Sequence, residues 1–177
     1  MNPVVKFCLS PLTLVVFLFS SFAMALPGDK FETIRGRAAN LTIDNKTGVA
    51  TYSGNVSIQQ GSLNIIADKL KVHRNAQGDV EKMVATGSPA RFQQQPDPEK
   101  GIITASAKSI TYIPANENLL LVDDASVEQD GSVMSGSKIN YDLAKEILKA
   151  SGDTQQENSG VILVIPPSKS NPEKANQ

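Results

Sequence analysis

One short string in the sequence matches a catalytic pair. Ser135-Gly-Ser-Lys138 has the Ser-x-x-Lys spacing in which a lysine activates a serine nucleophile for acyl transfer, provided that a helical turn brings the two side chains together. Residues Val133 to Tyr141 instead alternate apolar and polar positions, which predicts a strand. Residues three apart in a strand point to opposite faces, so we expect no nucleophile–base pair here.

Metal-binding residues are few. His73 is the only histidine, which excludes a multi-histidine metal site, and its place beside Arg74 at the end of an expected strand predicts a solvated surface residue. Asp123-Asp124 offers two carboxylates to a cation but is more typical of a turn. The sequence thus predicts no enzyme activity, no cofactor and no metal.

The first 25 residues predict an export signal. Lys6 precedes a nearly continuous apolar run from Phe7 to Phe22, which is shorter than the roughly 20 residues that a spanning helix needs. The run ends at Ala23-Met-Ala25, the small-x-small pattern of a signal peptidase site, so we expect cleavage before Leu26 and a periplasmic protein. Cleavage would remove Cys8, the single cysteine, and leave a protein without disulfides.

The charge balance excludes one class of partner. The chain has 17 Lys and Arg against 18 Asp and Glu, a formal net charge of −1. Nucleic-acid binding requires a basic face, which this composition does not predict.

Period-two alternation runs through most of the remaining chain and predicts an all-β fold. Turn residues separate the alternating stretches at residues 44–48, 60–61, 75–78, 114–116 and 130–131. Pro114 predicts an early end for the strand that contains Tyr112. Residues Asp142 to Ala150 fit either a short helix or a turn followed by a strand over residues 146–150.

The strands form repeated units. Each unit opens with a small residue, a polar residue and alternating apolar positions, continues through a turn into a second strand, and closes with a third strand that often ends in glutamine. The opening strands are residues 39–43, 67–72, 107–112 and 137–141, and the closing ones are residues 56–60, 90–94 and 127–129. Because one unit cannot bury its own apolar row, such units stack into a solenoid-like or rolled sheet.

The ends of the expected domain differ from its middle. We expect one domain over residues 26–167, whose last strand is the uninterrupted apolar Val161–Ile165, closed by Pro166-Pro167. Residues 168–177 contain no large apolar side chain and predict a disordered tail. The alternation also selects a row of inward-facing residues, each of which either fills the core or contacts an apolar guest: Ile34, Ile43, Val56, Ile58, Ile65, Val72, Phe92, Tyr112, Leu121 and Ile139.

The string Gly54-Asn-Val-Ser-Ile-Gln-Gln-Gly61, followed by Ala67-Asp68, resembles the signature of the LptA/OstA-like family. Residues 90–92, 107–112, 136–141 and 161–166 resemble later parts of the same pattern, so that the resemblance covers residues 31–167. It implies a twisted, partly open antiparallel β-jellyroll whose apolar slot accepts the acyl chains of lipopolysaccharide, the lipid A portion. It also implies that Ile34, Phe92 and Tyr112 line that slot.

The resemblance further implies a bridge protein that takes part in outer-membrane assembly by carrying lipopolysaccharide from the inner to the outer membrane. Copies would stack end to end, between LptC-like and LptD-like jellyroll domains at the two membranes. The residues themselves leave an alternative open, which is a structural or glycan-binding β-solenoid with a filled interior and no lipid cargo. Few aromatic residues and no tryptophan disfavour sugar-stacking platforms but do not exclude this alternative.

The two outermost strands predict the partner surfaces, because an unpaired strand edge accepts a further strand. We expect these edges over residues 31–37 and 161–165, and head-to-tail pairing of unlike edges produces filaments. The candidate edge residues are Phe31, Thr33 and Arg35 at one end, and Val161, Leu163 and Ile165 at the other.

Overall fold

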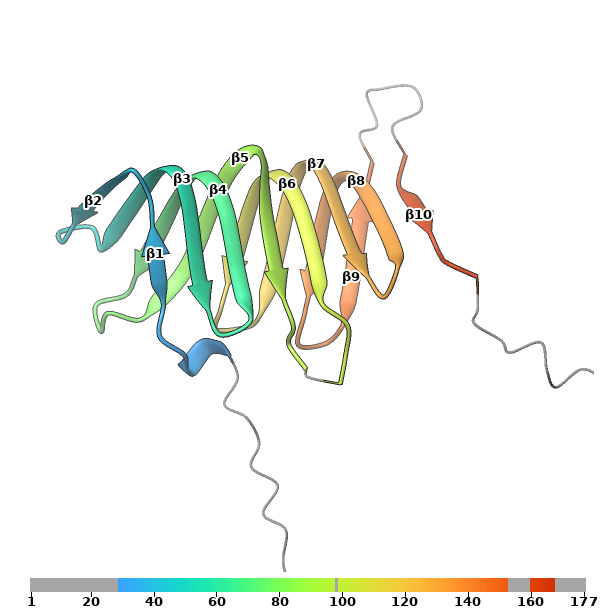
Figure 1. The fold of residues 1–177 in the computed structure, drawn as a ribbon, viewed down its shortest axis with the longest axis horizontal. Coiled ribbons are helices and arrows are strands. Elements are labelled where there is room, and N and C mark those ends of the chain that lie inside the picture. The colour runs from blue at the N-terminus through green and yellow to red at the C-terminus, as the bar shows by residue number, and fades with distance from the viewer. Residues whose placement is uncertain (1–28, 98, 153–159, 168–177) are drawn as a thin grey trace, which may run out of the picture.

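The residues that the structure describes fold into one antiparallel β-sheet of ten strands (Figure 1). The computed structural model describes residues 29–97, 99–152 and 160–167. Neighbours along the sheet follow the order β1-β3-β4-β5-β6-β7-β8-β10, with β2 paired to β3 and β9 paired to β8. The elements are η1 (Asp29–Phe31), β1 (Arg35–Arg37), β2 (Asn40–Asp44), β3 (Val49–Gln60), β4 (Leu63–Arg74), β5 (Val80–Gln94), β6 (Ile103–Ile113), β7 (Asn118–Gln129), β8 (Ser132–Asp142), β9 (Ile147–Ser151) and β10 (Ile162–Val164).

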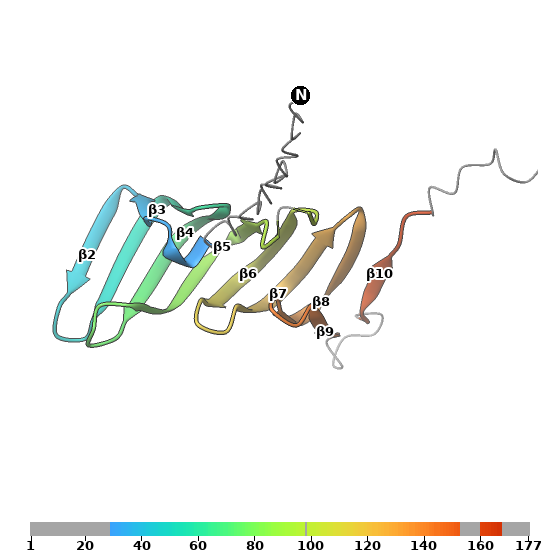
Figure 2. The same cartoon turned by 90° about the horizontal axis from the view of Figure 1, so that it is seen from below.

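Six long strands, β3 to β8, bend sharply near their middles. The pairing register shifts there in successive strand pairs, for example between Ser53 and Val56 in β3 and between Val122 and Ala125 in β7. Such bulges bend a strand and increase its twist. The aligned bends fold the sheet over, so that the strands run up one side and down the other (Figures 1 and 2). We call the side containing β1 and β10 the front half and the side containing β2 and β9 the back half.

This bending joins stretches that the sequence indicated as separate strands. Residues 49–54 and 56–60 are the two arms of β3, and β5 and β7 are built in the same way. Asp123-Asp124 was expected to form a turn, and that expectation is wrong, because both residues lie inside β7 at its bend. Their φ angles of 62° and 52° are left-handed, a conformation that aspartate tolerates better than most side chains.

Small residues allow the two halves to converge at the bend. Ala67, Ala90, Ala107 and Ala125 are at most 5% exposed and lie at the bends of four strands. In β3 the bend contains Gly54 at φ 80°, where an added Cβ would lie 2.8 Å from the Cβ of Ala39. Larger side chains at these positions would hold the halves apart, so the alanine and glycine pattern helps to set the fold.

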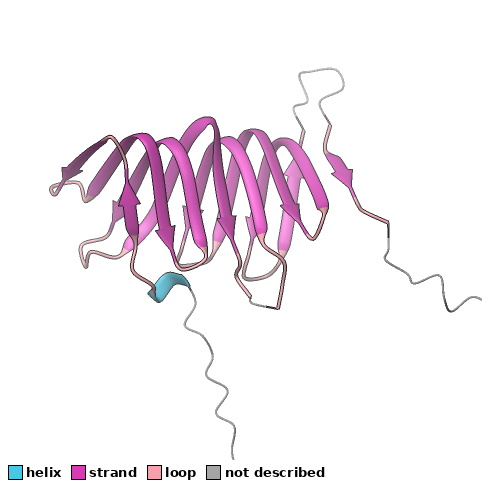
Figure 3. Ribbon diagram, viewed as in Figure 1, coloured by secondary structure: helices cyan, strands magenta, loops and turns pink. Residues whose placement is uncertain are grey.

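The other expectations about local structure are mostly confirmed. The fold is all-β and antiparallel, and β6 ends at Ile113, directly before Pro114 (Figure 3). Residues after Asp142 form a turn followed by β9, which confirms the strand alternative over the helix. Asp44 stabilises the β2–β3 turn by accepting hydrogen bonds from the backbone N–H groups of Lys46 and Thr47. No helix among the described residues is long and apolar enough to cross a membrane.

The terminal strands are shorter than expected. The strand expected over residues 31–37 begins only at Arg35, because residues 29–31 form a 3-10 turn, which is fixed by hydrogen bonds that the Asp29 carboxylate accepts. Phe31 and Thr33 are therefore not part of an edge strand. The last strand is limited to Ile162–Val164, so Val161 and Ile165 flank it. The expected signal peptide and C-terminal tail lie outside the described residues.

Candidate binding groove

The interior between the two halves is lined by rows of apolar side chains that cross the whole sheet. Strand register defines these rows, because residues that pair side by side point to the same face. In the front half one row runs through Gly36, Ile58, Ile65, Phe92, Ala105, Val127, Met134 and Leu163. In the back half two rows run through Leu41, Tyr52, Leu70, Ala85, Ile110, Leu121, Ile139 and Ala150, and through Ile43, Ala50, Val72, Met83, Tyr112, Leu119, Tyr141 and Leu148.

In the middle of the sheet, side chains of the two halves pack directly against each other. Phe92, Leu70, Leu121 and Ile139 are each fully buried. The rings of Phe92 in the front half and Tyr112 in the back half lie with their centroids 5.3 Å apart at an interplanar angle of 53°, a tilted contact that adds to their burial. The interior is therefore closed by the protein's own side chains at this level.

Polar side chains replace apolar ones where the halves face each other at the open margin of the fold, which we call the mouth. The glutamines that end β3, β5 and β7 point inward there: Gln60, Gln94 and Gln129. Tyr141 of the back half donates a hydrogen bond from its hydroxyl to Oε1 of Gln129 at 2.8 Å. Lys100 and Glu146 form an ion pair between the two sides, from the β5–β6 loop to the β8–β9 turn. These contacts hold the mouth closed.

The pKa of Tyr112 reflects the burial of its hydroxyl group at the inner edge of the mouth. Burial raises it to about 12, and hydrogen bonding by the side-chain amide of Gln94 opposes this rise. A tyrosine in such a place remains neutral at any physiological pH. Neutral tyrosine and glutamine side chains therefore line the inside of the mouth, and a solvent-exposed ion pair lies on the outside.

The N-terminal segment crosses the front margin of the mouth. The Asp29 carboxylate accepts hydrogen bonds from the backbone N–H of Ser62 at 2.7 Å, from the Ser62 hydroxyl at 2.6 Å and from Nε2 of Gln94 at 2.9 Å. Nε2 of Gln60 donates to the Glu32 carbonyl at 3.0 Å. Figure 1 shows η1 below the lower ends of the strands.

A cleft of about 540 Å³ opens at the mouth beside this segment. Phe31, Ile34 and Gln60 line its front side, and Val80 and Pro114 line its back side. Phe31 is 74% exposed, so an apolar side chain stands at the entrance. The cleft continues the closed interior outward to the surface of the protein.

Residues 37–147 match the protein family described as LptA/(LptD N-terminal domain) LPS transport protein. The chain belongs to this family. It is 34% identical over 160 residues to the lipopolysaccharide export system protein LptH of Pseudomonas aeruginosa, which covers 88% of this chain and 91% of LptH. It is 36% identical over 148 residues to the lipopolysaccharide export system protein LptA of Haemophilus influenzae, which covers 82% of this chain and 86% of that protein.

A solved structure agrees with this assignment. The crystal structure of LptH from Pseudomonas aeruginosa, described as the LptA-homologous periplasmic component of a conserved lipopolysaccharide transport device, superimposes with a TM-score of 0.73 at 30% identity. The match covers 80% of this chain and all of LptH. The LptA-family fold that the sequence suggested is thereby confirmed, including the rolled β-jellyroll.

In this LptA-family chain, most of the predicted inward residues lie in the interior rows. All of them except Ile34 and Ile43 belong to the buried core. Ile43 continues the row of Ala50 and Val72 but is 50% exposed, because β2 is the last strand of the back half and no other described strand covers it. Ile34 precedes β1 and lines the mouth cleft. Contact of any of these residues with lipid remains a prediction.

Sequence reasoning missed the residues that close the mouth. The glutamine at the end of each closing strand was noted as part of the repeat, yet no role was assigned to Gln60, Gln94 or Gln129. The period-two alternation could have predicted that these side chains point inward, because each glutamine follows an inward apolar residue by two positions. Asp29 gave no such signal, because its partner Ser62 is 33 residues away.

The residues considered for chemistry are not assembled into a reactive site. Ser135 and Lys138 lie on β8, and the Ser135 hydroxyl donates to that of Ser126 at 3.2 Å. His73 pairs with Lys82 on the neighbouring strand, and its pKa is lowered by partial burial and by Lys82 and Lys71. Among the described residues, no group of three or more His, Cys, Asp or Glu side chains could hold a metal.

Proposed function

We propose that this chain is an exported periplasmic carrier of lipopolysaccharide, and that it holds acyl chains between the two halves of its bent sheet. The observation that carries the proposal is the set of apolar rows that run without interruption from β1 and β2 to β9 and β10. Burial of each CH₂ group of an acyl chain contributes about 0.8 kcal/mol, so several chains are held without any charged contact. Membership of a lipopolysaccharide-transport family supports the same ligand.

Acyl chains enter when the halves separate at the mouth. The interior is filled in the structure, so a guest must displace the Phe92–Tyr112 contact and the hydrogen bond between Tyr141 and Gln129. The side chains around these contacts are apolar. Their contacts with the acyl chains of the guest would replace the side-chain contacts that are lost when the halves separate. Such a sheet hinges at its aligned bends, where small residues and irregular pairing make the strands most deformable.

In-cell photo-crosslinking tests this site. A photo-reactive residue at position 92 or 112 should form adducts with lipopolysaccharide, whereas one at Lys71, on the outward face of the back half, should not. Adducts at Lys71 alone would overturn the proposal. Absence of adducts at all three positions, in a protein that still folds, would favour the filled β-solenoid without lipid cargo.

The proposal includes end-to-end assembly, because the apolar rows are uncovered at both ends of the sheet. Leu41 and Ile43 on β2 are 51% and 50% exposed, and Leu163 on β10 is 54% exposed. A cleft of about 300 Å³ beside Leu163 is lined by Met134, Tyr141 and Leu148, which belong to the same rows. Pairing of one copy's β9 and β10 with β1 and β2 of the next would continue these rows across copies.

Charge substitution at an end tests assembly. Leu163→Lys should reduce the concentration-dependent rise in mass seen by light scattering, because it places a charge in the row that the next copy would cover. Ile66→Lys is the matched control, since Ile66 is 48% exposed on the outward face, away from both ends. Equal masses for the parent chain and Leu163→Lys at every concentration would contradict assembly. The same ends are proposed to receive the LptC-like and LptD-like jellyroll domains.

A further inference from the structure

The outward face of the front half carries a polar groove that the lipid-carrier proposal does not use. Gln59 pairs side by side with Asn64, and Asn64 pairs with Gln93, so three side-chain amides stand next to one another on β3, β4 and β5. Neighbouring strands lie about 4.8 Å apart, which sets the spacing of the amides. Together with Ser57, Ser62 and Gln95 they line a groove of about 500 Å³, with Ile102 at its edge.

The three amides are available to a ligand. Gln59 and Gln93 are exposed and Asn64 is half-buried. Their side chains make no hydrogen bond to any other residue that the structure describes. Each amide offers two N–H donors and a carbonyl acceptor, which matches the mixed donor and acceptor character of sugar hydroxyl groups. Gln60 and Gln94, one position further along the same strands, are by contrast engaged in closing the mouth.

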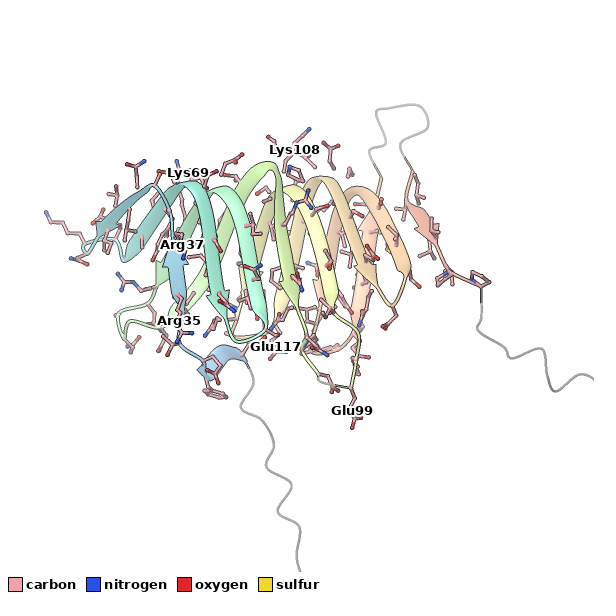
Figure 4. All side chains as sticks on the ribbon, in the orientation of Figure 1. Arg35, Arg37, Lys69, Glu99, Lys108 and Glu117 are labelled. Carbon is pink, nitrogen blue, oxygen red and sulfur yellow. The ribbon has the colours of Figure 1, made fainter. Side chains whose placement is uncertain are left out.

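Positive charge flanks this groove. Arg35 and Arg37 project from β1 beside Gln59 and Ser57 (Figure 4). Arg91 on β5 belongs to the same row as Ser57 and Ile66, and therefore lies on the same face. None of the three forms an ion pair within the described ranges. A guanidinium binds phosphate or carboxylate through two parallel hydrogen bonds. Two acidic residues lie near this face. Glu128 is at its far end on β7, and the Asp29 carboxylate beside the groove accepts hydrogen bonds from Ser62 and Gln94. The three arginines outnumber Asp29, so the β1–β5 side of the groove attracts anionic groups.

The groove begins where the mouth ends. Gln60 lines the mouth cleft, its neighbour Gln59 lines the groove, and Gly61 forms the rim between them. If the acyl chains of a molecule lie between the halves, its polar part lies at the mouth. Only the β3–β4 turn at Gly61 then separates this polar part from the groove. The two sites are thus close enough to hold two parts of one molecule.

We propose that this face, defined by Gln59, Asn64, Gln93 and the three arginines, binds an acidic oligosaccharide. Resting on the proposed function, the inference identifies this saccharide as the phosphorylated sugar portion of the lipopolysaccharide whose acyl chains occupy the interior. The amides hold the hydroxyl groups and the guanidinium groups hold the phosphates. The outward face of the front half then provides specificity for the saccharide, and the apolar rows of the interior provide affinity for the acyl chains.

Calorimetric titration of the purified chain tests this site with three probes. The first is deacylated lipopolysaccharide, which keeps the phosphorylated sugars and lacks acyl chains; the second is the same material after phosphatase treatment; the third is maltoheptaose. We expect binding of the first, affinity about tenfold lower for the second because charge-assisted hydrogen bonds are lost, and no binding of the third. No binding of the first probe, or equal binding of all three, would overturn the inference.

Variants locate the binding. Combined Gln59→Ala, Asn64→Ala and Gln93→Ala substitutions should weaken binding of deacylated lipopolysaccharide by about tenfold or more, without lowering the melting temperature, because these side chains form no hydrogen bonds within the described part of the chain. The matched control combines Thr42→Ala, Thr51→Ala and Lys71→Ala, an equivalent outward row on the back half. Unchanged binding in the first variant, or an equal loss in the control, would contradict the assignment.

Crosslinking at position 92 separates this inference from the proposed function. If deacylated lipopolysaccharide binds the amide face while position 92 yields no lipid adduct, the carrier proposal fails and the saccharide site stands. If position 92 yields adducts while none of the saccharide probes binds, the carrier proposal stands and the saccharide site is overturned.

Discussion

The middle and the ends of the sheet are built from the same residue types in the same rows, yet they differ in what surrounds them. Ala50, Val72 and Met83 are buried, whereas Ile43, the next member of their row, is half exposed. The front half repeats this contrast between Val127 and Leu163. Exposure therefore depends on whether a neighbouring strand is present and not on the sequence pattern. The rows form a buried core in the middle of the sheet, and the same rows are exposed at its two ends.

Truncation of matched residues tests this contrast most strongly. Phe92→Ala should lower the free energy of unfolding by about 3–5 kcal/mol, because it leaves a cavity between the two halves. Leu163→Ala should lower it far less, since Leu163 is already 54% exposed. Urea unfolding followed by circular dichroism measures both. Similar losses for the two variants would show that the middle is as open to water as the ends.

High pH tests how dry the middle is. The pKa of Tyr112 is raised by burial to about 12, above the ordinary value of 10, so the folded state favours the protonated form. The resulting stability is present below pH 10 and is lost as the pH rises from 10 to 12, by about 2–3 kcal/mol. Unfolding experiments across this range should show the loss in the parent chain and a smaller loss in Tyr112→Phe. Equal slopes for both proteins would mean that water already reaches this hydroxyl.

The sequence predicted the inward rows well because they depend on a local rule. Alternation alone assigned Phe92, Tyr112 and Leu121 to one face, and the structure buries all three. It could not show that Phe92 and Tyr112 meet across the fold, since that contact depends on the bends. The bends themselves were expected only as breaks between strands, because Asp123-Asp124 and Gly54-Asn55 look like turns in a linear sequence.

The closure of the mouth was beyond such local rules. The hydrogen bonds of Asp29 join residues 33 and 65 positions apart, and no periodicity links them. The same bonds fix η1 and displace the start of β1, which explains why the first strand is shorter than alternation predicted. The exposure of Ile43 was missed for a related reason, because alternation gives the face of a residue but not whether another strand covers it.

Removal of one hydrogen bond at the mouth should have a smaller effect on stability and a clear effect on access. Tyr141→Phe removes the bond to Gln129 and should lower the free energy of unfolding by about 1 kcal/mol. Entry of a fluorescent fatty acid, measured by stopped flow, should become faster because the halves separate more easily. Tyr52→Phe is the control, since the Tyr52 hydroxyl makes no hydrogen bond in the described part of the chain. Slower or unchanged entry in Tyr141→Phe would place the entrance elsewhere.

The smallest effect is expected on the outward face, where His73 responds to acid without contact with the interior. Its pKa is lowered mainly by partial burial and further by Lys82 and Lys71, so the folded state favours neutral imidazole. That contribution to stability is complete above the unfolded pKa of about 6.5 and is lost as the pH falls through the lower folded value. Melting temperatures between pH 7 and pH 5 should therefore fall less steeply in His73→Gln than in the parent chain. If the two slopes agree, the acid response comes from other groups. Fatty-acid entry should be the same in both proteins at pH 7, because His73 belongs to an outward row and the contacts that close the mouth do not include it.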